Sequence, residues 1–435
     1  MSLSSLLGNG TLYPTMARTS LQPYTITGVD IGSTAIRVAM GQVYPDSGRK
    51  QRVQIIGAIE VPSEGIQKGN VVSIDETVSS LSHALEQIER LTGVPVDHAW
   101  IGISSAETQA QHNKGVIAVA KPDGEISDED VDRVVDAART IAPPLNYEML
   151  HVLPSSYAVD GQTGIKDPVG MTGIRLEVDA QIIYTSAAHL KHITKAVYRT
   201  GIDIDDVVLS ILASAQIVVS DRQKELGVVV VNIGGPTTSV AVYEGGEVVH
   251  TATLPIGSEH VTNDVAIGLR TSIDVAERVK KEFGHCRAQD VPKKETIDLV
   301  GLGQKESEVV SVHYIAQIIE ARMTEIFEKV NEELQKIHRS QLLPAGAVFT
   351  GGGANISGLV DLAKDELSLP ASIGYPIDVD SISDKVNSLA FSPAIGLVVW
   401  GTDMTQERTR KGTSRFQATG KAIESLRGFW KTLIP

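Results

Sequence analysis

A carboxylate, Asp30, stands just before a turn of small residues in the segment GVDIGSTAIRVAMG. The turn consists of Gly32, Ser33 and Thr34. Such a turn can aim successive backbone N–H groups into one concavity, which suits the terminal phosphates of a ligand. Asp30 could hold Mg²⁺ through water, because Mg²⁺ usually keeps several of its waters, and Arg37 could reach a phosphate. Taken alone, the segment is explained equally well by a plain hairpin with a capping aspartate.

The same pattern returns 202 positions further along, where residues 230–243 read VVNIGGPTTSVAVY. In both copies alternating β-forming residues flank a short turn, which is typical of a β-hairpin. A tight turn alone would again explain the second copy. Two copies in register predict two related domains that face each other across a cleft and clamp the tail of a nucleotide. The second hairpin would contribute Asn232, Gly234, Gly235, Thr237 and Thr238.

Three consecutive glycines, Gly351, Gly352 and Gly353, precede Asn355 in the segment AVFTGGGANISGLVDLAKDEL. The segment reads as a strand, a glycine turn and a helix. Glycines let a flat base approach the backbone because no side chain stands in the way. A strand-to-helix turn needs only one glycine, so three favour a binding role. The sequence contains no GxxxxGK[ST] motif, and no GxGxxG motif follows a predicted strand.

These motifs need rigid elements to position them, and the hydrophobic periodicity predicts both strands and helices. Helices are predicted over residues 75–92 and 312–338, and a further helix begins at the N-cap residue Ser127 and ends at Pro143. Strands are predicted around 98–104, 148–159 and 175–186. The alternation of strands and helices indicates an α/β protein.

The chain of 435 residues is 42% hydrophobic and carries a net charge of −14. Its length suggests two or more domains, and its acidic body is not expected to bind nucleic acid. The single cysteine, Cys286, cannot form an intrachain disulfide, which fits a reducing cytoplasm. No apolar run is long enough for a transmembrane helix. Residues 1–24 lack the features of a signal peptide, and we predict a flexible arm there.

The C-terminal tail reverses the charge of the body, with seven basic and two acidic residues between Thr405 and Pro435. Residues 404–419 are polar and predict a linker. Residues 420–435 predict an amphipathic helix whose apolar and basic faces can lie on an anionic membrane. The alternative is a helix docked on the body of the protein itself. The predicted membrane-binding residues are Ile423, Leu426, Arg427, Phe429, Trp430, Lys431, Leu433 and Ile434.

Residues 25–403 and the terminal helix resemble the actin-like ATPase superfamily and, within it, the FtsA family of cell-division proteins. TGVDIGSTAIRVAMG is similar to its first phosphate loop, and GVVVVNIGGPTTSVAVYEGGEVVHTATLPIGSEHVTNDVA to its second. VFTGGGANISGLVDLA is similar to the adenosine loop, and AFSPAIGLVVWG to the end of the nucleotide domain. GLRTSIDVAERVKKEFG resembles the segment after the second loop, where Glu277 and Lys280 match positions near the ribose and base.

The resemblance implies a two-lobed actin-like fold, a duplicated ribonuclease H-like α/β fold, with an FtsA-type domain inserted in the first lobe. The implied ligands are ATP and Mg²⁺, with Asp30 as the catalytic carboxylate. The implied partners are further copies in filaments, the C-terminal tail of the tubulin-like protein FtsZ, and the cytoplasmic face of the cell membrane at the division site. Candidate FtsZ contacts are Lys293, Lys294 and Arg322. The implied domains are 1A (25–97 and 183–226), inserted 1C (98–182), 2A (227–257 and 344–403) and 2B (258–343).

Three residues depart from the superfamily pattern. The second phosphate loop usually starts with Asp, and Asn232 cannot match a carboxylate as a base. Pro236 stands where glycine is usual and removes one N–H donor from the turn. Ser210 occupies the place where many relatives carry Glu to orient the attacking water. The resemblance with these departures predicts ATP binding and slow hydrolysis.

Two rival interpretations remain open. The type IV pilus assembly protein PilM has a similar fold with an inserted domain, but it needs no membrane helix like that of residues 420–435. A small-molecule kinase of the same superfamily would need a carboxylate base near the γ-phosphate, and Asn232 and Ser210 argue against one.

Overall fold

The first lobe is built on a six-stranded sheet. The structure is a computed structural model that describes residues 23–44, 52–140 and 143–410. The sheet has the order β11-β6-β1-β2-β3-β19. Neighbours β1, β2 and β3 are antiparallel, whereas β6 and β11 run parallel to β1. Its strands are β1 (Tyr24–Ile31), β2 (Ala35–Tyr44), β3 (Arg52–Pro62), β6 (His98–Ile103), β11 (Asp203–Leu209) and β19 (Asp380–Ser381).

The second lobe repeats this sheet with the order β14-β13-β12-β17-β18. Again the first three strands form antiparallel pairs, and the next two run parallel to β12. Both predicted hairpins exist, and they occupy the same place in each sheet. The predicted duplicated, two-lobed α/β fold is therefore confirmed. The strands are β12 (Val228–Ile233), β13 (Thr238–Glu244), β14 (Glu247–Leu254), β17 (Ala347–Thr350) and β18 (Ala371–Ile373).

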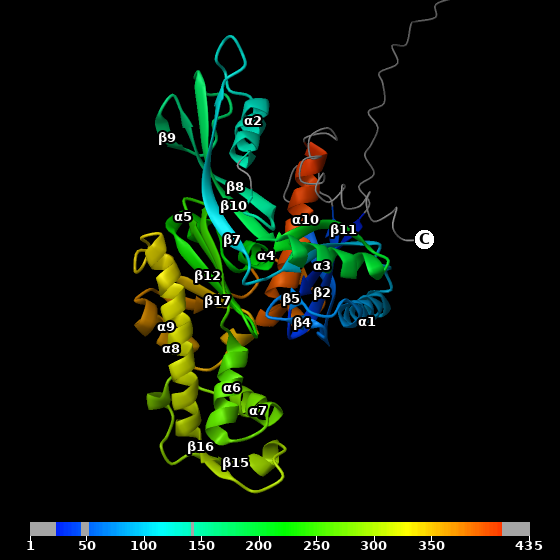
Figure 1. Ribbon diagram of the computed structural model, residues 1–435, viewed down its shortest axis with the longest axis vertical. Coiled ribbons are helices and arrows are strands. Elements are labelled where there is room, and N and C mark those ends of the chain that lie inside the picture. The colour runs from blue at the N-terminus through cyan, green and yellow to red at the C-terminus, as the bar shows by residue number, and fades with distance from the viewer. Residues whose placement is uncertain (1–22, 45–51, 141–142, 411–435) are drawn as a thin grey trace, which may run out of the picture.

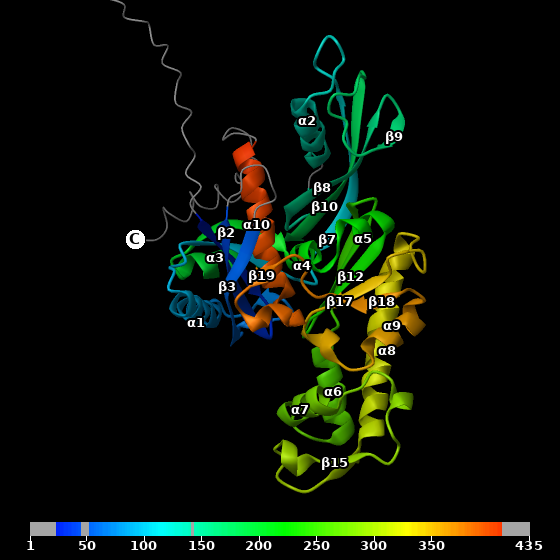
Figure 2. The same cartoon turned by 180° about the vertical axis from the view of Figure 1, so that it is seen from behind.

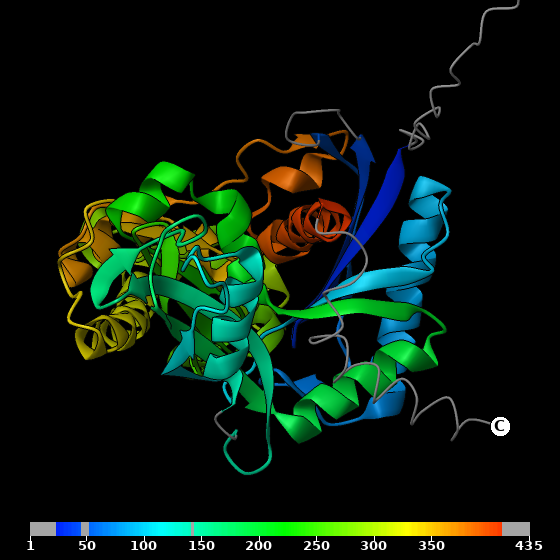
Figure 3. The same ribbon diagram turned by 90° about the horizontal axis from the view of Figure 1, so that it is seen from above.

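Two helices, α4 (Ser210–Val218) and α10 (Ser392–Arg410), lie between the two sheets. Helix α10 packs on β1 and β2, while α4 contacts β12 and β13 of the other lobe. The two helices approach closely where Gly396 meets Ala213, because a Cβ on Gly396 would lie 2.1 Å from the Ala213 carbonyl oxygen. Figure 3 shows α10 end-on beside the first sheet. The opposite face of that sheet is covered by α1 (Ile74–Thr92) and α3 (Ala187–Arg199).

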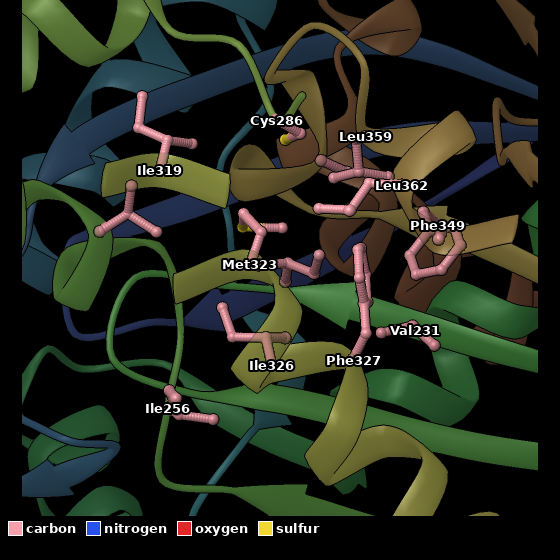
Figure 4. Close-up of a cluster of buried hydrophobic side chains, with 14 of the residues drawn as sticks. Val231, Ile256, Cys286, Ile319, Met323, Ile326, Phe327, Phe349, Leu359 and Leu362 are labelled. Atoms are coloured by element: carbon pink, nitrogen blue, oxygen red, sulfur yellow. The ribbon is translucent and has the colours of Figure 1, made fainter. Parts of the chain in front are cut away.

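The core of the second lobe lies under α8 (Val312–Lys336). This helix places buried apolar residues at helical spacing against the sheet and against α9 (Leu359–Leu367). Phe327 of α8 packs edge-on against Phe349 of β17, with the ring centroids 5.5 Å apart (Figure 4). Helices α6 (Ser258–Leu269) and α7 (Ile273–Phe283) complete this end of the molecule. The short elements are β4 (Ile66–Gln67), β5 (Asn70–Val71), α5 (Asp221–Leu226), β15 (Thr296–Asp298) and β16 (Val309–Ser311).

The inserted domain is a four-stranded sheet of order β7-β10-β8-β9 with one helix. It stands at the end of the molecule opposite α6 and α7 (Figures 1 and 2). Its helix starts at Ser127 as predicted, and the Asp130 carboxylate accepts a hydrogen bond from the Ser127 backbone N–H, which closes a capping box. The elements are β7 (Gln109–Ala118), α2 (Asp128–Arg139), β8 (Tyr147–Val159), β9 (Gln162–Ile165) and β10 (Arg175–Ser186).

Several predicted boundaries are wrong. Domain 1C cannot begin at 98, because strand His98–Ile103 pairs with β1 and β11 in the first sheet, and it cannot end at 182, because β10 continues to Ser186. Domain 2A cannot extend to 403, because β19 pairs with β3 and α10 packs on the first sheet. The predicted linker 404–419 begins too early, because α10 continues to Arg410.

The predicted arm 1–24 falls almost wholly outside the described residues, as do the remainder of the linker and the whole terminal helix 420–435. Within the described ranges, no helix has the length and apolar character needed to span a membrane.

Candidate functional site

The turns of the two hairpins meet at a cleft of about 840 Å³ between the lobes. Two hydrogen bonds cross from one lobe to the other at this cleft. The Thr34 hydroxyl donates to Glu259 Oε1 at 2.7 Å, and the hydroxyls of Ser104 and Ser239 lie 2.8 Å apart. The duplication of the sheets therefore brings two similar turns face to face.

Asp30 ends β1 beside the first turn, and its side chain is buried, with the residue 7% exposed. The Ser210 hydroxyl donates to Asp30 Oδ1 at 2.8 Å. Burial raises the pKa of the Asp30 carboxyl, and the bond from Ser210 and the charge of Arg37 only partly offset this shift. Asp30 can accept further hydrogen bonds from water, as the predicted Mg²⁺ site requires.

Arg37 lies opposite Asp30 in the β1–β2 register. Its Nε donates to Glu60 Oε2 at 2.7 Å, and its guanidinium stands 6.0 Å from the centre of the Phe391 ring. Arg37 lines the cleft as predicted. Its charge is shared with Glu60, a cleft residue that the sequence analysis missed.

The second turn is held by the start of α6. The backbone N–H groups of Ser258 and Glu259 donate to the carbonyl oxygens of Gly234 and Gly235, both at 2.9 Å. Gly235 lies next to the hydrogen bond between Thr34 and Glu259, because an added Cβ would lie 2.2 Å from Thr34 Oγ1 and would turn that side chain aside. Thr238 does not reach the cleft, since it is fully buried in β13 and does not line the cavity. The strand alternation turns its side chain into the sheet packing, so its predicted contact with a ligand is wrong.

Helices α6 and α7 place an ion pair at the other end of the cleft. Lys280 Nζ lies 2.6 Å from Glu277 Oε2, and the Thr262 hydroxyl donates to the same oxygen at 2.6 Å. Burial lowers the pKa of Lys280, against the effect of Glu277. Burial alone would raise the pKa of Glu277, but the hydrogen bonds from Lys280 and Thr262 reverse this and lower it. These contacts hold the two side chains together at this end of the cleft.

The glycine turn closes the third side of the cleft. Gly351 has a φ of 88°, and a Cβ there would lie 2.2 Å from Asn232 Oδ1. Gly352 and Gly353 also line the cleft, and Asn355 Nδ2 donates to the Gly352 carbonyl oxygen at 3.1 Å. The bare backbone leaves a flat wall on which an aromatic base can lie.

Every predicted nucleotide contact except Thr238 lines this one cleft. Five further lining residues were not predicted from the sequence, namely Glu60, Ser104, Ser258, Glu259 and Thr262. The signal for Ser258 and Glu259 was present, because they open a helix directly after a strand. The predicted membrane-binding residues between Ile423 and Ile434 lie outside the described residues.

The side chains at the turns suit a hydrated magnesium ion rather than a metal held by protein alone. Asp30, Asn232 and Glu259 offer oxygen atoms, which Mg²⁺ prefers. Among the described residues, no group of three or more His, Cys, Asp or Glu side chains is placed to hold a metal ion. A cation here would take most of its ligands from water and from a bound phosphate.

Comparison with known proteins identifies the family. The model of the cell division protein FtsA matches residues 229–396, and that of the SHS2 domain inserted in FtsA matches residues 105–184. The cell division protein FtsA of Pseudomonas aeruginosa is 34% identical over 376 residues, which cover 86% of this chain and 89% of the relative. The chain belongs to the FtsA family. The FtsA of Bacillus subtilis is 38% identical over 348 residues, 80% of this chain and 78% of that protein.

Membership of the FtsA family confirms the predicted role in bacterial cell division. The match to the inserted SHS2 domain begins after β6, which agrees with the corrected start of the inserted domain.

Solved structures with the same actin-like fold include the PilM-PilN type IV pilus biogenesis complex, with a TM-score of 0.62 and 15% identity over 87% of this chain and 98% of that chain. MreB5 of Spiroplasma citri bound to ADP has a TM-score of 0.52 and 12% identity, and the match covers 89% of this chain and 98% of that chain. At these identities the likeness shows a shared fold only. The chain therefore shares its architecture with PilM, whereas its sequence places it in the FtsA family.

Proposed function

We propose that the cleft binds ATP with Mg²⁺, and that this FtsA family member forms filaments that anchor FtsZ to the cytoplasmic face of the membrane and recruit the division machinery. The observation that carries the proposal is the convergence of both hairpin turns and the glycine turn on one cleft. MreB5, which has the same fold, was solved with ADP. The proposed filaments follow from membership of the family and from this fold.

Each side of the cleft takes one part of the nucleotide in this proposal. The backbone N–H groups of Gly32–Thr34 in the first turn, and of Gly235 and Thr237 in the second, bind the phosphates. The N–H of Gly234 already donates to the Thr237 carbonyl oxygen. Gly351, Gly352 and Gly353 lie along the base, and the ion pair of Lys280 with Glu277 lies near the ribose. A hydrated Mg²⁺ at Asp30 neutralises phosphate charge when bound.

We expect slow hydrolysis, because Asn232 and Ser210 are neutral where superfamily relatives carry acids. The Ser210 hydroxyl donates a hydrogen bond to Asp30, so this hydroxyl is already used in a contact within the protein. The turnover expected in a phosphate-release assay is below roughly 1 s⁻¹. A faster rate would contradict this part of the proposal while leaving nucleotide binding intact.

The membrane tether rests on the sequence of the C-terminal segment. The described chain ends in α10 at Arg410, and residues 411–419 span at most about 30 Å when extended. One helix of this kind binds weakly and reversibly, and a filament that carries many of them gains avidity without any new contact. The body therefore stays within a short distance of the membrane.

Of the three candidate FtsZ contacts, the structure favours two. Arg322 already forms ion pairs with Asp264 and Glu325, so it offers little to a partner. Lys293 and Lys294 are exposed on the far end of the second lobe. In this proposal, Lys293 and Lys294 are therefore the candidates that could form ion pairs with an acidic peptide.

Co-sedimentation with liposomes in the presence of ATP tests the tether. The full chain is compared with a chain truncated after Ala418, and with full-length Trp430→Glu as a matched point variant, on anionic and neutral vesicles. We expect only the full chain to pellet, and only with anionic vesicles. If no version pellets, the terminal helix is structural and a pilus-type adaptor role becomes the better account.

A further inference from the structure

The carboxylate of Glu259 lies at the point where the two hairpin turns meet. Its Oε1 accepts the 2.7 Å hydrogen bond from Thr34, which belongs to the other lobe. A Cβ on Gly235 would lie 2.2 Å from Thr34 Oγ1 and 2.5 Å from Glu259 Oε1, so this hydrogen bond passes directly over the second turn. A phosphate held by both turns would have to meet Glu259.

The carboxylates that line the cleft outnumber its basic side chains. Three basic side chains line the cleft, namely Arg37, Lys280 and Lys281, and six carboxylates do so. Arg37 pairs with Glu60, and both lysines pair with Glu277. Among the described residues the Glu259 carboxylate forms no direct ion pair. It accepts the hydrogen bond from the neutral Thr34 hydroxyl, and Lys280 attracts it only from a longer distance. The lining of the cleft therefore carries an excess of negative charge, and Glu259 contributes to this excess where the two turns meet.

We propose that Glu259 selects nucleoside triphosphate that carries a bound divalent cation and excludes the metal-free form by charge repulsion. This inference rests on the proposed function and adds a specificity residue to it. Glu259 acts on the charge of the polyphosphate tail, while Thr34 exchanges its bond with Glu259 for one with a phosphate oxygen when the tail enters.

Asp30 is less suited to this discrimination. It is buried at the end of β1, and Ser210 already donates a hydrogen bond to it. Glu259 is more exposed and stands in the first turn of α6, anchored through its backbone to the Gly235 carbonyl oxygen at 2.9 Å. Its position is fixed by the helix, so it cannot withdraw far from an entering phosphate.

Calorimetric titration of the full chain with ATP, in Mg²⁺ and separately in EDTA, tests the proposal. Glu259→Gln removes the charge and keeps an oxygen to accept from Thr34. We expect the native chain to bind metal-free ATP at least about tenfold more weakly than Mg²⁺-ATP, and Glu259→Gln to recover most of that difference in EDTA. Glu86→Gln, on the exposed face of α1, makes the same charge change away from the cleft and should leave the ratio unchanged.

Thr34→Val separates charge from the hydrogen bond, because it removes the bond and keeps the carboxylate. The ratio of the two affinities should persist in Thr34→Val, and thermal melting checks that each variant is folded. If the native chain binds ATP and Glu259→Gln shows the native ratio, Glu259 is not the selecting residue and nucleotide binding stands. If the native chain binds no ATP in either buffer, the proposed function and this inference both fail.

Discussion

At the scale of single residues, Gly235 leaves room for the hydrogen bond that joins the two lobes. A methyl group there would collide with Thr34 Oγ1 of the first lobe and with Glu259 Oε1. Both contacts belong to the hydrogen bond that joins the lobes across the cleft. Alanine at this position would therefore turn the side chains of Thr34 and Glu259 aside and break this hydrogen bond.

We predict that Gly235→Ala weakens ATP binding about tenfold, because the added methyl group and the displaced side chains of Thr34 and Glu259 would occupy space that the proposed site gives to the phosphates. Gly301→Ala is the matched control, since a Cβ on Gly301 has open space around it. Equilibrium titration with Mg²⁺-ATP measures the effect, and thermal melting shows whether the fold is kept. If Gly235→Ala binds Mg²⁺-ATP with the affinity of the native chain, the phosphates do not lie against the second turn.

His189 is a buried histidine of α3 that affects stability rather than the site. It is 4% exposed, and neither ring nitrogen has a hydrogen-bond partner in the described structure. Burial lowers the pKa of His189 to about 4, with a smaller opposing effect of Glu107 and a further lowering by His192. The unfolded chain holds an ordinary histidine with a pKa near 6.5.

Because the unfolded state binds the proton more tightly, stability falls as the pH drops from about 6.5 towards 4. We predict that His189→Leu removes on the order of 1–2 kcal/mol of the difference in unfolding free energy between pH 7.5 and pH 5. Urea denaturation at both pH values measures this, with the exposed His83→Leu as the control. If the native chain and His189→Leu show the same pH dependence of the unfolding free energy, His189 does not cause the loss of stability at low pH.

At the scale of elements, the sequence predicted what is local. The hairpins at Asp30 and Asn232 were found because the alternation and turn residues lie within about fourteen positions of each other. By contrast, the sequence did not predict which sheet β6 joins. The apolar run HAWIGI of β6 would fit a central strand of the first lobe or of the inserted domain equally well. The polar run that follows Asp403 was predicted to be a linker, because its Thr, Gln and Glu residues show no apolar periodicity, but α10 continues through it to Arg410.

The residues of the site also fall into those that local sequence predicts and those that it does not. Gly234 and Gly351 could be predicted from local turn chemistry, whereas Thr238 was placed on the wrong side of its strand. Glu60 and Ser104 were missed because their roles come from contacts with residues distant in sequence, such as Ser104 with Ser239. No periodicity in the sequence records such a contact.

The crossing of α4 and α10 gives the element-scale prediction. A Cβ on Gly396 would lie 2.1 Å from the Ala213 carbonyl oxygen, and a backbone atom cannot move aside as a side chain can. Overpacking typically costs about 1–3 kcal/mol, and alanine recovers up to about 1 kcal/mol through its helix propensity. We predict that Gly396→Ala lowers the free energy of unfolding by about 1–2 kcal/mol, while Glu86→Ala on exposed α1 changes it by less than about 0.5 kcal/mol. An unchanged denaturation midpoint in Gly396→Ala would mean that the helices separate easily.

At the scale of the whole molecule, the inserted domain is attached to both lobes. Its chain enters and leaves through the first lobe, but its strands β7 and β8 pack against β14 of the second lobe. Lys166 forms an ion pair with Glu225 of α5 at 2.6 Å. His151 of β8 accepts a 3.0 Å hydrogen bond from the backbone N–H of Leu209, the residue before Ser210. Movement of one lobe against the other must therefore also displace the inserted domain.

The proposed filaments and the proposed C-terminal tether together predict the form of a membrane-binding curve. A single tail should bind anionic vesicles weakly, whereas a filament presents many tails and binds steeply with protein concentration. We predict a cooperative binding curve for the full chain with ATP and a simple hyperbolic, weaker one for residues 419–435 fused to a monomeric carrier. Higher ionic strength should weaken both, because screening reduces the attraction of Arg427 and Lys431 for the surface. If the full chain and the fusion give the same hyperbolic curve, each tail acts alone and filaments contribute nothing to the tether.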